Sequence, residues 1–118
     1  MGSALSDEKS IHDILVFWFK EISPEAWFKK DALFDDILMK KFGQIIEQAL
    51  AGQIDRWAQN KDGRLALILL LDQMTRNIFR NTPKAFSGDE IACALSLRSL
   101  ADGFLETEKS MHKRQFFL

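Results

Sequence analysis

One group of polar side chains has residue types and a spacing that suit ligand recognition. Asp72, Arg76 and Arg80 follow one another at i, i+4 and i+8, and Gln73 and Asn77 form a second i, i+4 row beside them. Residues three or four positions apart are neighbours on an α-helix, so all five side chains lie on one side of it. One carboxylate, two guanidiniums and two amides on a rigid helix suit an anionic or amide-rich ligand. These residues are therefore the best candidate contacts.

The same group also fits a purely structural role. Asp72 and Arg76 form a helical ion pair in this reading, while the other side chains bond loop carbonyls and fix the turn before Pro83. Semi-buried polar networks more often hold structure than bind ligands, so the structural role is favoured. Arg64 lies at the other end of the same helix, and it is placed to join the group from a neighbouring turn if the group lines a pocket.

Aromatic side chains supply a second candidate feature. The chain has 10 Phe, 3 Trp and no Tyr, and indole faces attract ammonium groups. Trp18 falls on a helical apolar pattern and is expected in the core. Trp27 lies in a connector, and for it both a pocket wall and core packing remain open.

Other chemistry-bearing residues are isolated. His12 and His112 stand 100 positions apart, and no two-histidine metal spacing occurs. Cys93 is the single cysteine, which excludes an intramolecular disulfide; between two alanines it is expected to be a small buried side chain. No nucleophile elbow, P-loop or dinucleotide-binding glycine pattern is present. We therefore expect no catalytic site, no metal and no cofactor.

The elements that position these residues are expected to be helices. Apolar positions recurring at i, i+3, i+4 and i+7 predict a first helix over 7–22, capped by Ser6 and ended by Pro24. A second helix is predicted over about 31–51, capped by Asp31 and stopped by Gly52. Gly43 in its middle suggests a close helix crossing.

The third helix begins at about residue 64 and is the central element. Residues 65–71 are all apolar, which is typical of a helix enclosed by others. A fourth helix follows Ser87 and Glu90, which form a capping-box pattern, and a fifth is predicted from about 108 onward, capped by Thr107. The sequence therefore predicts an all-α, antiparallel array of about five helices.

Composition sets the broad class of the protein. With 118 residues, 47% hydrophobic and 28% charged, we expect one globular domain over 1–118, in which 1–6 are disordered or a cloning scar. A net charge of -1 argues against nucleic acid or an anionic membrane as a partner. The longest apolar run has seven residues, too short to span a bilayer. A cytoplasmic location is expected from the single cysteine and the lack of a secretion signal.

Several segments together resemble a known family. They are Ile14-Leu15-Val16-Phe17-Trp18-Phe19, Trp27-Phe28-Lys29-Lys30-Asp31, and the stretch from Gly63 through Asp72-Gln73 to Arg76-Asn77-Ile78-Phe79-Arg80, followed by Ala85-Phe86. In these the chain resembles the bacterial domain-of-unknown-function 924 family. The resemblance implies an all-α array similar to tetratricopeptide-like superhelices, and it implies no established activity.

The resemblance also implies a difference at the carboxyl end. Family members continue past Phe116-Phe117-Leu118 into a segment with a Pro, a His-Ser-Glu motif and further helices, and this chain stops before it. The apolar end then needs another surface to cover it. We therefore hypothesise self-association into a homo-oligomer through this end.

Two functions are compatible with these observations. The leading one is a non-enzymatic, cytoplasmic, helical-repeat-like module that binds a peptide, a protein or a small ligand through the residues around Asp72 and Arg76. The alternative is an enzyme or small-molecule binder with a polar pocket around Arg64, Asp72 and Arg76. A deep cleft at the polar group would favour the second.

Overall fold

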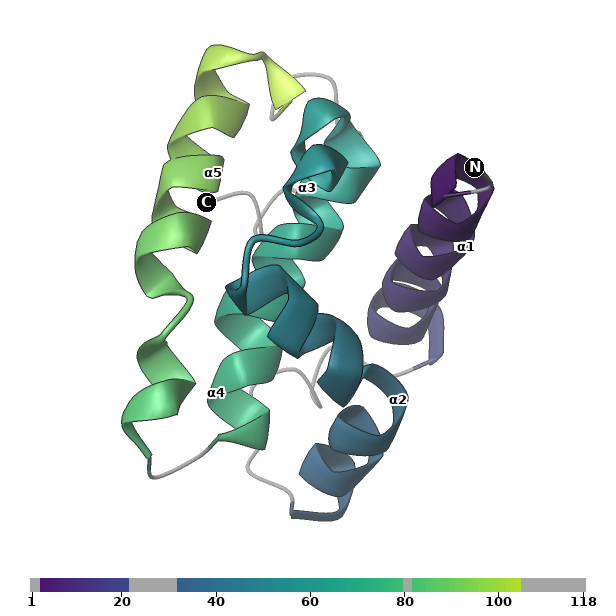
Figure 1. Ribbon diagram of the computed structural model, residues 1–118, viewed down its shortest axis with the longest axis vertical. Helices are drawn as coiled ribbons and strands as arrows, with labels where there is room; N and C mark the ends of the chain where they lie inside the picture. The colour runs from purple at the N-terminus through teal and green to yellow at the C-terminus, as the bar shows by residue number, and fades with distance from the viewer. Residues whose placement is uncertain (1–2, 22–31, 80–81, 105–118) are drawn as a thin grey trace.

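The computed structural model describes residues 3–21, 32–79 and 82–104, with side chains from residue 7 onward. Throughout these ranges the regular elements are helical, which confirms the predicted all-α array of antiparallel helices (Figure 1). In chain order they are α1 (Ser3–Val16), η1 (Phe17–Glu21), α2 (Ala32–Leu50), η3 (Asp55–Gln59), α3 (Lys61–Ile68), η4 (Leu69–Met74), α4 (Thr75–Ile78), η5 (Pro83–Phe86) and α5 (Asp89–Ala101).

The centre of the fold is one continuous helical rod made of α3, η4 and α4. Each side chain of residues 65–71 is at most 2% exposed, which confirms the predicted enclosure. Helix α1 packs on α3, α2 packs on η4 and α4, and α5 packs on α3 and η4. In Figure 1, α1 and α5 accordingly lie on opposite sides of α3.

Side-chain hydrogen bonds cap the start of the rod and stabilise its middle. The rod starts at Lys61, three residues before the expected start, because the Asn60 side chain accepts a hydrogen bond of 2.8 Å from the Gly63 amide. Its middle, η4, is π-helical. There the Thr75 hydroxyl donates to the Leu71 carbonyl at 2.8 Å, so this buried oxygen has a partner.

The first helix starts earlier than expected. It begins at Ser3, inside the 1–6 stretch that was expected to be disordered or a cloning scar, so Ser6 is part of the helix rather than its cap. Arg56 donates two hydrogen bonds to Asp7, at 2.6 and 2.8 Å. These bonds join the amino-terminal part of α1 to η3 and stabilise the helix there. After Val16 the helix widens into the π-helical turn η1, whose Trp18 is fully buried, as predicted for a core residue.

The second helix matches its predicted bounds closely. Leu38, Phe42, Ile46 and Ala49 form its buried stripe, and Gly52 after its end has a φ of 77°, the left-handed conformation expected of a glycine stop. The close crossing expected at Gly43 is wrong. A Cβ there would meet only Met39, one turn earlier on the same helix.

The start of α5 differs from the prediction. The capping box is wrong: the Ser87 hydroxyl donates back to the Lys84 carbonyl, and the cap position is occupied by Gly88, which has no side-chain cap bond. Gly88 lies so close to the rod that a Cβ would stand 2.2 Å from the Leu71 carbonyl oxygen. Backbone proximity, rather than a capping side chain, therefore fixes where α5 starts.

The prediction for Cys93 is also wrong, because its side chain is exposed. Helix α5 buries the face that carries Ala92, Leu95 and Ser99 against the rod, and Cys93 lies on another face. His12 is exposed, as expected for a surface histidine.

Some predictions fall outside the described residues. They concern Trp27, the cap at Asp31, Arg80, the fifth helix from about 108, His112 and the apolar end at Phe116–Leu118. Within the described ranges, every helix is too short or too polar to cross a bilayer.

Replacing Leu69 by alanine tests the enclosure of the rod. Leu69 is fully buried, so Leu69→Ala leaves a cavity and should lower the free energy of unfolding by about 2–5 kcal/mol. The control is Leu33→Ala, at a side chain that is 71% exposed, with an expected change within about 0.5 kcal/mol. Urea unfolding measures both, and equal effects would place the core elsewhere.

Candidate functional site

The predicted polar group forms a surface ion network at the carboxyl end of the rod. Arg76 lies 3.1 Å from the Asp72 carboxylate and 3.2 Å from that of Asp89. The Gln73 amide donates to Asp72 at 2.9 Å. Asp89 is the first residue of α5, so the network joins η4 and α4 to the first turn of that helix. It combines one guanidinium with two carboxylates, which favours the structural role among the two considered for this group.

An exposed aromatic ring lies beside this network. Phe86 is 61% exposed, and the Arg76 guanidinium carbon lies 5.6 Å from its ring centroid. Asn77, from the second predicted row, is buried, and Gln73 is half-buried. Two more candidate residues, Arg80 and Trp27, lie outside the described residues.

Arg64 does not join this group. It stands two turns earlier on the rod and is only 1% exposed. Its Nε and Nη2 both donate to the Ala58 carbonyl, at 2.9 and 2.7 Å, and its Nη1 donates to Asp102 at 2.7 Å. The Phe104 ring lies over the guanidinium, with its centroid 4.3 Å from Cζ. Arg64 therefore clamps η3, α3 and the end of α5 together, and its donors face backbone and Asp102 rather than a pocket with Asp72.

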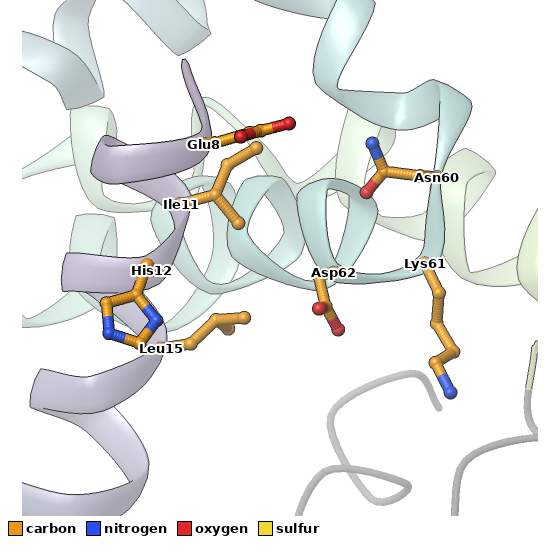
Figure 2. Close-up of a pocket in the computed structure, with 7 residues that line it drawn as sticks. All are labelled: Glu8, Ile11, His12, Leu15, Asn60, Lys61 and Asp62. Carbon is orange, nitrogen blue, oxygen red and sulfur yellow. The ribbon is translucent and has the colours of Figure 1, made fainter. Parts of the chain in front are cut away.

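A cavity of about 660 Å³ lies between α1 and the start of α3. Its lining residues in the described part of the chain are Glu8, Ile11, His12, Leu15, Asn60, Lys61 and Asp62. Figure 2 shows Ile11 and Leu15 projecting from α1 toward α3, where Asp62 projects into the same space, while Lys61 points away from α1. The two apolar side chains are buried and the carboxylates are exposed. The cavity thus has an apolar floor and an acidic, solvent-facing rim.

The acidic rim has charge to offer a ligand. Neither Glu8 nor Asp62 forms an ion pair with another residue in the described part of the chain. Asp62 lies in the first turn of α3, and Glu8 lies on α1 on the other side of the cavity. The rim is thus suited to a cationic group, and the floor to an apolar one. No group of three metal-binding side chains occurs in the described ranges.

A brace next to the cavity holds its walls in place. Asp7 precedes Glu8 on α1 and binds Arg56 of η3 through two hydrogen bonds. The hydrogen bonding to Arg56 holds the pKa of Asp7 below its usual value. Burial raises this pKa, and the side chain of Trp57 lowers it further. Because η3 leads directly into α3, the brace fixes the distance between the two sides of the cavity.

Sequence reasoning missed this cavity. The run from Asn60 to Gly63 carries no ligand-binding motif, although Asn60 has the residue type of a helix cap. Glu8 and His12 stand at i and i+4, which places them on one side of α1 and indicates a polar face there. That this face lies opposite the start of α3 depends on tertiary packing and has no local signal.

Comparison with protein families identifies the chain. The model of a bacterial protein family of unknown function, DUF924, matches residues 14–118. The chain belongs to the DUF924 family. This confirms the resemblance seen in the apolar rod and its polar end, and the family has no established function. No curated protein matches the chain.

A solved structure supports the fold. The DUF924 chain is similar to the structure of protein of unknown function ATU0120 from Agrobacterium tumefaciens, with 33% sequence identity and a TM-score of 0.85. The match covers 99% of this chain and 62% of that one. The DUF924 chain therefore spans less than two thirds of that relative's length.

Substitution of Arg64 distinguishes a clamp from a ligand contact. Arg64→Leu removes three hydrogen bonds and leaves the Ala58 carbonyl without these donors, so it should cost about 2–4 kcal/mol of stability. Asp102→Asn changes a half-exposed partner and should cost under about 1 kcal/mol. The measurement is urea unfolding of both variants. A loss for Arg64→Leu no larger than that for Asp102→Asn would contradict the clamp.

Proposed function

We propose that this DUF924 protein is a non-enzymatic binding module whose ligand site is the cavity between α1 and α3. The cavity itself carries the proposal. Its volume of about 660 Å³ lies within the range of roughly 300–1,000 Å³ that is typical of small-ligand sites. Ile11 and Leu15 supply apolar contact, and Glu8 and Asp62 supply charge at the rim. The ligand is a small amphipathic cation, or a peptide side chain of the same chemistry.

Charge selects a cation over an anion. The described lining residues include two carboxylates, those of Glu8 and Asp62, and the Lys61 side chain points away from α1 (Figure 2). An ammonium group at the rim gains from both carboxylates, while its alkyl chain covers Ile11 and Leu15.

One class of catalytic group does not occur among the described lining residues. The described lining residues include no serine, threonine or cysteine, so they offer no hydroxyl or thiol nucleophile of the kind that acyl transfer uses.

The proposal also covers the location of the protein and its architecture. The single exposed thiol suits a reducing, cytoplasmic location. The antiparallel helices suit a tetratricopeptide-like, helical-repeat arrangement.

A second candidate function is supported by Phe86. Together with Arg76 and Asp89 it forms an exposed aromatic and charged surface, and aromatic residues and arginine are enriched at protein interfaces. A peptide or protein partner would dock there. This retains Asp72, Gln73 and Arg76 as contacts and needs no cavity.

Binding of hexylammonium tests the cavity directly. Titration should shift the methyl NMR signals of Ile11 and Leu15, while hexanoate of equal chain length should leave them unchanged, because the rim is acidic. Glu8→Gln and Asp62→Asn should each weaken the binding of hexylammonium about two- to fivefold, the effect expected for a solvent-exposed charge pair.

The matched control is Asp36→Asn, which removes an exposed carboxylate on α2 and should leave binding unchanged. Equal binding of hexanoate would show that the carboxylates do not select the ligand. Shifts confined to residues near Phe86 would move the site to the second candidate surface.

A further inference from the structure

Helix α5 is apolar on the side that faces away from the rod. Ala92, Leu95 and Ser99 are buried against α3 and η4, yet Leu97 is 63% exposed, and Ile91 and Leu100 are exposed as well. In Figure 1, α5 forms one edge of the array, with α3 and α4 on its inner side. A helix that is apolar on both faces is normally covered on both.

Six exposed residues form one stripe along this outer face. They are Glu90, Ile91, Ala94, Leu97, Arg98 and Ala101, and all are exposed. Relative to Ala94 they stand at -4, -3, 0, +3, +4 and +7, which is the spacing of a helix–helix contact seam. Apolar residues fill the middle of the stripe, with a charge near each end.

We propose that this outer face of α5 binds the same face of a second copy of the chain, with the two α5 helices antiparallel and a two-fold axis at Ala94. The stripe is self-complementary about that residue. Antiparallel pairing places Glu90 opposite Arg98 of the second copy, and Ile91 opposite its Leu97, and the axis repeats both pairs. A two-fold interface requires this property, since one patch must fit itself.

The two charges are available for this pairing. Neither Glu90 nor Arg98 forms an ion pair with another residue in ranges 32–79 and 82–104. They are eight residues apart, about 12 Å along the helix axis, so they do not pair with each other within one chain. A parallel arrangement would bring Glu90 against Glu90, which charge repulsion disfavours. The antiparallel one joins opposite charges at both ends.

Small side chains let the helices approach. Ala94 lies on the proposed axis and Ala101 near the end of the stripe, so no bulky residue separates the helices at the crossing. Leu97 from each copy then packs beside the axis. This surface lies on the opposite side of α3 from the cavity, so the inference is independent of the proposed ligand. It places self-association on α5 rather than on Phe116–Leu118.

Solution mass over a concentration series tests the proposal. Sedimentation equilibrium from micromolar to near-millimolar protein should show a rise toward twice the 13.6 kDa of one chain. Leu97→Asp should abolish the rise, because it buries a carboxylate against Ile91 of the second copy at two symmetry-related places in the interface. Leu33→Asp on α2, which replaces a similarly exposed leucine, should leave it unchanged. Circular dichroism checks that both variants stay helical.

Charge reversal tests the antiparallel register. Glu90→Arg and Arg98→Glu should each raise the dimer dissociation constant about tenfold, since each creates two like-charged contacts. The double variant restores opposite charges and should recover the original constant. A chain that stays monomeric at every concentration overturns the proposal, as does a dimer unaffected by Leu97→Asp. Failure of the double variant to recover overturns it as well.

Discussion

Burial of the apolar segment 65–71 is the constraint on which the rest of the structure depends. A seven-residue run with no polar side chain must be covered on all sides, because each large apolar side chain gains about 1.5–3 kcal/mol when it leaves water. Helices α1, α2 and α5 provide that cover. Their positions follow from the rod, and so do the surfaces that they form with it.

Polar groups at both ends of the rod hold the covering helices in register. At the amino end, Asn60 caps the rod and Arg64 joins η3 to the end of α5. At the carboxyl end, Arg76 joins the rod to the start of α5. Arg64 contributes more to stability than Arg76, because a buried guanidinium is tolerated only when its donors are satisfied. The cavity with α1 lies beside the first of these ends and the exposed Phe86 beside the second.

Periodicity predicted what depends on local sequence. The all-α class, the burial of Trp18 and the enclosure of the rod follow from apolar spacing, and the end of α2 follows from Gly52; the structure confirms them. The carboxylate partner of Arg64, Asp102, is 38 residues away, so no local pattern indicates it. The capping box at Ser87 failed because the same hydroxyl also reaches the Lys84 carbonyl, and the tight approach of Gly88 to the rod decides the start of α5. The sequence did not predict the cavity, because the cavity forms only where α1 packs against α3 in the folded chain.

Native-state hydrogen exchange tests the central role of the rod most directly. Amide protons of residues 65–71 should exchange most slowly in the chain, with a protection free energy equal to that of global unfolding. Amides of α5 and of the start of α1 should exchange faster through local opening. If the amides of 65–71 exchange as fast as those of α5, the rod opens locally, and the account of a scaffold that positions both surfaces is contradicted.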